Sequence, residues 1–133
     1  MTTLIECILT SVWKALSEVG KTYDTPDLQN GSQFIVCDAD INSITIKTTG
    51  GAHISIDRAQ FHEALKYLIE NGHLGAGDPC KIEASRSKPG HLNRATSSLR
   101  SGTVVISYIL PMLASTEIVG IDGKRPNTTW INL

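Results

Sequence analysis

The side chains best suited to binding a ligand are basic, and they are concentrated in one segment of the chain. Residues 81–104 carry five Lys and Arg side chains against one acidic side chain, whereas residues 1–80 carry ten acidic against five basic side chains. The basic segment is also rich in Ser, Thr, Asn and Gly, so hydroxyls and backbone amides accompany its cations. These are the donors that bind a nucleic-acid phosphate backbone.

The candidate nucleic-acid-binding residues are the cations of this segment, its histidine and two cations of a later predicted turn. They are Lys81, Arg86, Lys88, His91, Arg94, Arg100, Lys124 and Arg125. Most of the seven aromatic side chains fall on predicted core stripes, which leaves few platforms for stacking single-stranded bases and favours duplex DNA as the partner. The alternative for the basic segment is a solvated surface loop, because charge clusters of this size are common on neutral domains.

The spacing of the residues gives less support for metal binding, for a cysteine nucleophile or for a glycine-rich phosphate loop. His73, Cys80 and His91 bracket one loop, but their spacing matches no tetrahedral metal site. Cys80 precedes Lys81 yet has no identifiable base, and the sequence 75–77 lacks the rest of a phosphate-binding glycine motif. We therefore predict a non-enzymatic protein with no metal and no cofactor.

The remaining cysteines and histidines are predicted to be structural. Cys7 and Cys37 lie within apolar runs and are expected to be small buried hydrophobes, whereas Cys80 is expected in an exposed loop. His53 and His62 are expected on a solvated strand face and beside a helix stripe. Three widely spaced cysteines predict no disulfide framework. No segment has the features of an export signal or a membrane span, so the sequence predicts a cytoplasmic protein without a membrane partner.

The composition predicts one compact domain spanning residues 1–133. The 41% apolar fraction is sufficient for one core, and the formal charge of −1 excludes a uniformly basic nucleic-acid coat.

The first half of this domain combines a helix with a small antiparallel sheet. Apolar residues recur every three or four positions from Leu4 to Val19, which predicts an amphipathic helix that Gly20 ends. Residues 21–32 are predicted to form a loop. Strands are predicted at 33–37, 43–48 and 52–56, with Ile44, Ile46, Ile54 and Ile56 facing the core.

The central helix has the clearest local signals. Asp57 and Gln60 form a predicted capping box, and Ile56 with Phe61 forms a hydrophobic staple. Phe61, Ala64, Leu65, Leu68 and Ile69 form the predicted buried stripe, which ends at Asn71-Gly72.

The second half begins with a long, basic, Ser- and Gly-rich excursion over residues 73–102. Within it, Pro89 is predicted to open a short helix that ends at Gly102. Residues 104–106 are predicted to be extended, and 107–115 to be helical with Pro111 in the first turn or at a kink. A hairpin is predicted over 117–133, with Asp122-Gly123 as its turn.

These elements together predict an α+β fold. The order of a helix, a short helix, an apolar helix and a hairpin with a basic turn loosely resembles a winged helix, which implies DNA binding. The apolar helix offers few donors to base edges, so residues 86–100 would have to read them. The sequence thus predicts a module that binds the duplex backbone. The alternative is an inhibitor or adaptor that binds a protein through its acidic first half or the 73–102 excursion; an inhibitor that mimics nucleic acid would cluster Asp24, Asp27, Asp38 and Asp40.

Overall fold

The computed structural model describes residues 2–27, 31–82, 91–97, 105–124 and 126–132. These ranges contain a mixture of helices and antiparallel strands, so the predicted α+β class is confirmed. In chain order the elements are α1 (Thr2–Leu16), β1 (Thr22–Asp24), β2 (Gln33–Ala39), β3 (Ser43–Thr48), β4 (His53–Asp57), α2 (Arg58–Glu70), β5 (Cys80–Lys81), α3 (His91–Ser97), α4 (Ile106–Ser115), β6 (Val119–Asp122) and β7 (Thr128–Ile131).

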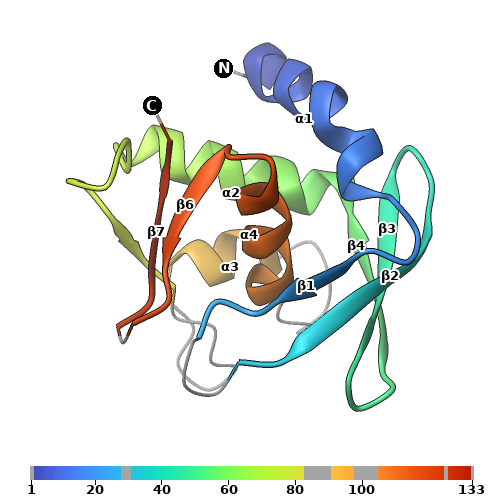
Figure 1. The fold of residues 1–133 in the computed structure, drawn as a ribbon. Helices are drawn as coiled ribbons and strands as arrows, with labels where there is room; N and C mark the ends of the chain where they lie inside the picture. The colour runs from blue at the N-terminus through green and yellow to red at the C-terminus, as the bar shows by residue number, and fades with distance from the viewer. Residues whose placement is uncertain (1, 28–30, 83–90, 98–104, 125, 133) are drawn as a thin grey trace.

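The strands form two separate antiparallel sheets (Figure 1). The larger sheet has the order β1-β2-β3-β4, and the smaller has the order β5-β7-β6. Helix α4 contacts β1 of the larger sheet and β6 of the smaller one, while α2 contacts β4 and β7. These two helices therefore connect the sheets into one body. The sequence did not predict β1 and β5, because strands of two or three residues are too short to show an alternating pattern.

The buried face of α1 is narrower than its apolar pattern predicts. Ile5, Leu9, Trp13 and Leu16 are buried, whereas Leu4 is 57% exposed. The helix ends at Leu16, so the predicted end of the stripe at Val19 lies beyond it. Among the described elements α2 is the main neighbour of this helix, and packing on one side buries one face of it.

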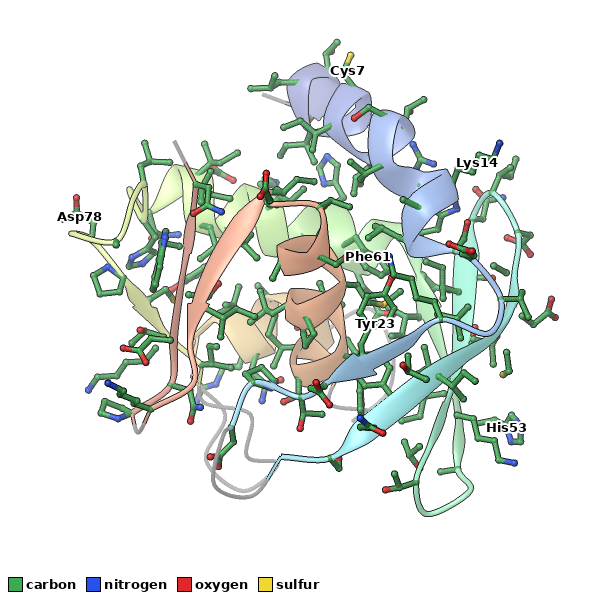
Figure 2. The ribbon with its side chains drawn as sticks, in the orientation of Figure 1. Cys7, Lys14, Tyr23, His53, Phe61 and Asp78 are labelled. Atoms are coloured by element: carbon green, nitrogen blue, oxygen red, sulfur yellow. The ribbon has the colours of Figure 1, made fainter. Side chains whose placement is uncertain are left out.

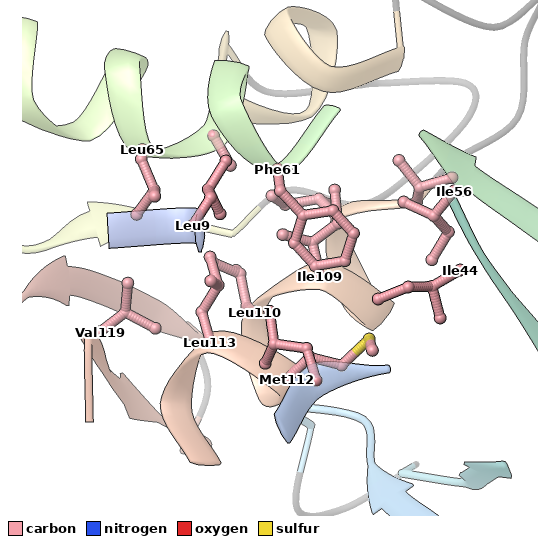
Figure 3. Close-up of a cluster of buried hydrophobic side chains, with 14 of the residues drawn as sticks. Leu9, Ile44, Ile56, Phe61, Leu65, Ile109, Leu110, Met112, Leu113 and Val119 are labelled. Carbon is pink, nitrogen blue, oxygen red and sulfur yellow. The ribbon is translucent and has the colours of Figure 1, made fainter. Parts of the chain in front are cut away.

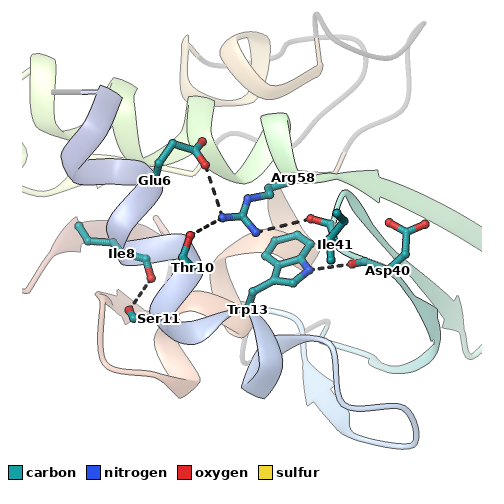
Figure 4. A network of polar contacts seen from close by, with 8 residues as sticks. All are labelled: Glu6, Ile8, Thr10, Ser11, Trp13, Asp40, Ile41 and Arg58. Atoms are coloured by element: carbon teal, nitrogen blue, oxygen red, sulfur yellow. Dashed lines mark hydrogen bonds and ion pairs between the residues drawn. The ribbon is translucent and has the colours of Figure 1, made fainter.

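A polar network joins α1 to α2 and to the turn between β2 and β3 (Figure 4). The Arg58 guanidinium donates to the Thr10 hydroxyl at 2.8 Å, lies 3.4 Å from the Glu6 carboxylate and stacks over the Trp13 ring at 5.1 Å. The Trp13 indole N–H donates to the carbonyl of Asp40 at 2.8 Å. Arg58 and Trp13 therefore hold α1, α2 and the β2–β3 turn together, although these segments are distant in sequence.

The alternating pattern of β3 and β4 is confirmed. Ile44, Ile46 and Ile56 are fully buried and Ile54 is partly buried. The register pairs Ile44 with Ile56 and Ile46 with Ile54, so one face of the sheet packs on the core. The opposite face carries the exposed side chain of His53, as predicted.

Helix α2 begins at the predicted capping box. Asp57 is the N-cap, its carboxylate accepts from the backbone N–H of Gln60, and the Gln60 amide oxygen accepts from the N–H of Asp57 at 2.9 Å. Ile56 and Phe61 flank this cap and are fully buried, as a hydrophobic staple requires. At the other end Gly72 has a φ of 73°, a backbone conformation that glycine adopts without strain.

The central core lies between α1, α2, α4 and the inner face of the larger sheet (Figure 3). Its largest fully buried side chain, Phe61, packs edge to face against Trp13 with ring centroids 5.2 Å apart. Phe34 of β2 makes a similar contact with Tyr108 of α4. Each of these ring pairs joins two elements and fixes their distance.

The apolar segment before the hairpin is helical from an earlier residue than predicted. Val105 has helical backbone angles and Ile106 begins α4, so the predicted extended structure at 105–106 is wrong, and residue 104 lies outside the described residues. Pro111 is the sixth residue of this helix rather than part of its first turn. Burial on several sides holds the segment helical although proline cannot donate a backbone hydrogen bond.

The predicted hairpin is confirmed with a different connection. Asp122 is the last residue of β6 and pairs with Thr128, so residues 123–127 join the strands instead of a two-residue turn at Asp122-Gly123. The Asp122 carboxylate accepts from the backbone N–H of Lys124 at 3.0 Å. A side chain therefore stabilises the longer connection in place of the predicted turn.

The cysteine predictions are corrected at two of three positions. Cys7 is exposed on the side of α1 that faces away from the body (Figure 2). Cys37 is partly buried, and Cys80, predicted to be exposed, is buried because β5 pairs with β7 and turns this side chain inward. In the described part of the chain, no helix has the length and apolar composition needed to cross a membrane.

Candidate nucleic-acid interface

Three of the eight predicted binding residues have described side chains, and all three are exposed. Lys81 belongs to β5, Arg94 to α3 and Lys124 to the connection between β6 and β7. His91 is the first residue of α3, but its side chain is not described. Arg86, Lys88, Arg100 and Arg125 lie outside the described residues.

Lys81 and Lys124 lie at the same end of the smaller sheet. Lys81 pairs with Thr128 of β7, and Thr128 pairs on its other side with Asp122. Neighbouring strands are about 4.8 Å apart, so the backbones of Lys81 and Asp122 are separated by roughly 10 Å. Lys124 follows Asp122 by two residues and is tied to it by the bond from its N–H.

Arg94 occupies the solvent side of α3. Leu92, Asn93 and Thr96 of the same helix are buried, and α3 contacts both α2 and α4. The Gln60 side-chain amide donates to the carbonyl of Thr96 at 3.0 Å, which fixes the end of α3 against the beginning of α2. The orientation of Arg94 therefore depends on buried residues that the basic pattern does not include.

None of Lys81, Arg94 and Lys124 forms an ion pair with a described acidic residue. In contrast, Arg58 pairs with Glu6 at 3.4 Å and Lys66 lies 3.9 Å from Glu70. Cations that no described carboxylate neutralises are suited to anionic ligands.

Helix α4 is unsuited to contact a nucleic acid, although it holds the place of the recognition helix in the order that resembles a winged helix. Six of its ten residues are buried, including Ile109, Leu110 and Met112 in its middle. It therefore acts as a core element, whereas the neighbouring α3 carries the exposed Arg94.

The acidic side chains of the first half do not form one cluster. Asp24 pairs with Gln33 at the start of β2, whereas Asp38 and Asp40 lie at its other end. The five residue steps from Gln33 to Asp38 correspond to about 17 Å of strand. The Asp40 carboxylate also accepts from the backbone N–H of Asn42 at 2.7 Å, so it stabilises the β2–β3 turn. The arrangement expected of a nucleic-acid mimic is absent from these described aspartates.

A second group of reactive side chain types lies between α2 and β5. The Tyr67 ring stacks on His73 with centroids 6.3 Å apart, and His73 Nδ1 lies 2.9 Å from the carbonyl oxygen of Asp78. Burial, and secondarily the nearby Cys80 thiol, raises the pKa of the Tyr67 phenol. The Tyr67 phenol is therefore a weaker acid than an ordinary tyrosine side chain. No group of three or more potential metal ligands occurs in the ranges that the structure describes.

A pocket of about 360 Å³ lies next to the start of α4. It is lined by Thr25, Pro26, Asp27, Ile82, Ser107, Tyr108 and Asn127. Its described lining contains no Lys, Arg or His side chain, so it does not extend the group of basic residues.

Sequence reasoning missed one surface residue beside the basic end of the smaller sheet. Trp130, which the sequence analysis did not single out, is partly exposed on β7. The adjacent Thr129 is fully buried, so the alternation of the strand turns Trp130 to the other face. The sequence Thr129-Trp130 indicates that the two side chains lie on opposite faces of a strand. Only the pairing of β7 with β6 shows which of the two faces the core.

Comparison with known proteins gives no independent assignment, because the chain matches no protein-family model, no curated protein and no solved structure.

Proposed function

We propose that this protein is a non-enzymatic module that binds duplex nucleic acid through the basic segment 81–104 and the β6–β7 connection. The observation that carries the proposal is the state of its three described cations. Lys81, Arg94 and Lys124 are exposed, and none is neutralised by a described carboxylate. Desolvation and ion-pair breakage would therefore not oppose phosphate binding at these positions.

The order of the elements agrees with this proposal. Helix α2 is followed by β5, α3, α4 and the β6–β7 hairpin, and β7 lies between β5 and β6. In a winged-helix arrangement the hairpin contacts the backbone beside a helix that enters the groove. Lys124 would then contact phosphate from the hairpin, and α3 with Arg94 would approach the groove in place of the buried α4.

A second candidate function is a protein-binding module that uses the first half of the chain. Its support is the exposure of three large apolar side chains there: Leu4 is 57%, Val19 is 63% and Ile41 is 75% exposed. Exposed apolar side chains are typical of protein interfaces when they form one patch.

The dependence of binding on salt tests the first function. Affinity for a labelled duplex should fall as salt rises, with a log-log slope of about −0.9 for each phosphate contacted. Replacing Arg94 with Ala should weaken binding to all sequences alike and make this slope shallower by about one. Lys47→Ala is the matched control, because Lys47 is an exposed cation on β3, outside the basic segment.

The two candidate functions predict different results. No binding to duplex at roughly 50 mM salt, where screening is weak, would overturn the nucleic-acid proposal. Equal effects of Arg94→Ala and Lys47→Ala would also contradict it, since binding would then depend only on total charge. The protein-binding function instead predicts that Leu4→Ser or Ile41→Ser abolishes a protein interaction and leaves duplex binding unchanged.

A further inference from the structure

The outer face of the smaller sheet carries an aromatic ring in a defined orientation. Val119 and Thr129 face the core, so the alternate positions Gly120 and Trp130 share the opposite face, where they pair directly across the strands. Helix α2 passes behind β6 and β7 in the view of Figure 1, and no described element covers the front of these strands.

The Trp130 ring lies flat against the backbone of β6. A Cβ atom at Gly120 would overlap three adjacent indole atoms, Nε1, Cε2 and Cζ2. Because glycine has no side chain, the ring can pack directly against the strand backbone. The indole N–H donates to the Asn132 side-chain oxygen at 3.2 Å. One ring face is thus covered by Gly120 and one edge is bonded, while the residue as a whole remains partly exposed.

The cations of the proposed interface border this ring. Lys81 lies opposite Thr128, two residues before Trp130 on the same face of the sheet. Such diagonal neighbours are about 7–8 Å apart, within reach of a long side chain. Lys124 follows β6 at the same end of the sheet, and the nearby Asp122 carboxylate already accepts the N–H of Lys124.

We propose that Trp130 is a stacking platform for one unpaired base of the bound nucleic acid, with Lys81 contacting an adjacent phosphate. This inference rests on the proposed function and adds a preference for nucleic acid that contains an unpaired base. An aromatic ring with a free face stacks any base, and a nearby cation neutralises the backbone that carries it. A fully paired duplex offers no base face to the ring, so the platform discriminates between the two forms.

The first test compares two labelled DNA duplexes that differ by a single unpaired thymine. Stacking of one base contributes about 1–3 kcal/mol, so the wild-type protein should prefer the bulged duplex by about 5- to 150-fold. Trp130→Leu should reduce this ratio to about one, whereas Trp130→Phe should retain part of it. Lys81→Ala should weaken binding to both duplexes and preserve the ratio.

The outcomes separate this inference from the function on which it rests. Binding to both duplexes with equal affinity, or an unchanged preference in Trp130→Leu, would overturn the stacking role and leave duplex binding intact. Absence of binding to either duplex would overturn both proposals.

A fluorescence measurement on the unmodified protein does not depend on the folding of the Leu variant. Trp13 is only 6% exposed and is hydrogen-bonded in the core, so emission that a base can quench arises from Trp130. Oligo(dT) should quench part of the tryptophan emission in the wild type and none in Trp130→Phe. Binding of the oligonucleotide without quenching would contradict the proposal.

Discussion

Replacing Gln60 with Met should destabilise the protein far more than its helical position suggests. The side chain is fully buried and makes two hydrogen bonds, one as an acceptor and one as a donor. Its oxygen accepts from the N–H of Asp57 at the start of α2, and its nitrogen donates to the carbonyl of Thr96 in the last turn of α3. Carbonyls at a helix end lack a partner within the helix, so one side chain completes two helix termini.

The expected loss follows from the burial of the two partners. Methionine has a similar length and helix propensity, so packing and backbone entropy change little. Thr96 is fully buried, and leaving its carbonyl unsatisfied costs about 1–3 kcal/mol. Asp57 is only partly buried and water can replace part of its bond, so the second loss is about 1 kcal/mol. Gln60→Met should therefore lower the free energy of unfolding by about 2–4 kcal/mol.

Urea unfolding followed by circular dichroism measures this difference. Lys66→Met is the matched control, because Lys66 lies on the same helix and its contact with Glu70 is exposed. That change should stay within about 0.5 kcal/mol of the wild type. If the midpoints of the two variants coincide, the buried bonds of Gln60 contribute no net stability and the reasoning is refuted.

Three further changes test the core, the α1 contacts and the cysteines. Leu65→Ala should cost about 2–5 kcal/mol in a urea titration, because Leu65 is fully buried; a wild-type midpoint would contradict its place in the core. Arg58→Ala should cost about 1–2 kcal/mol and increase hydrogen exchange in α1 more than in α2, since it removes the stacking on Trp13 and the bond to Thr10; uniform exchange would argue against a local contact. Cys7 should react with a thiol reagent much faster than Cys80 in the folded protein, and the reverse order would place β5 incorrectly.

The signals that predicted structure correctly are local in sequence. The capping box of Asp57 and Gln60 spans one helical turn, and the alternation of Ile44, Ile46 and Ile56 spans two adjacent strands. In each case the residues that determine the structure are also those that show the pattern. The sequence consequently predicted the ends of α2 and the inner face of the larger sheet.

The candidate nucleic-acid interface is less predictable, because it depends on which elements meet. The sequence located the basic segment, but three described cations are placed by other parts of the chain: Lys81 by pairing with β7, Lys124 by a five-residue connection, and Arg94 by the bond between Gln60 and Thr96. A charge count along the chain contains no information about these contacts.

Features set by local sequence were determined by the sequence alone, and features that depend on contacts between distant elements were decided by the tertiary structure. Composition and periodicity determined an α+β domain, its central helix and the separation of acidic and basic segments. Tertiary structure decided that Cys7 is exposed, that Cys80 is buried and that Trp130 faces outward, because each of these depends on strand register or on which side of a helix finds a neighbour. A shift of one residue in register exchanges the two faces of a strand, and no local pattern of two to four residues specifies it.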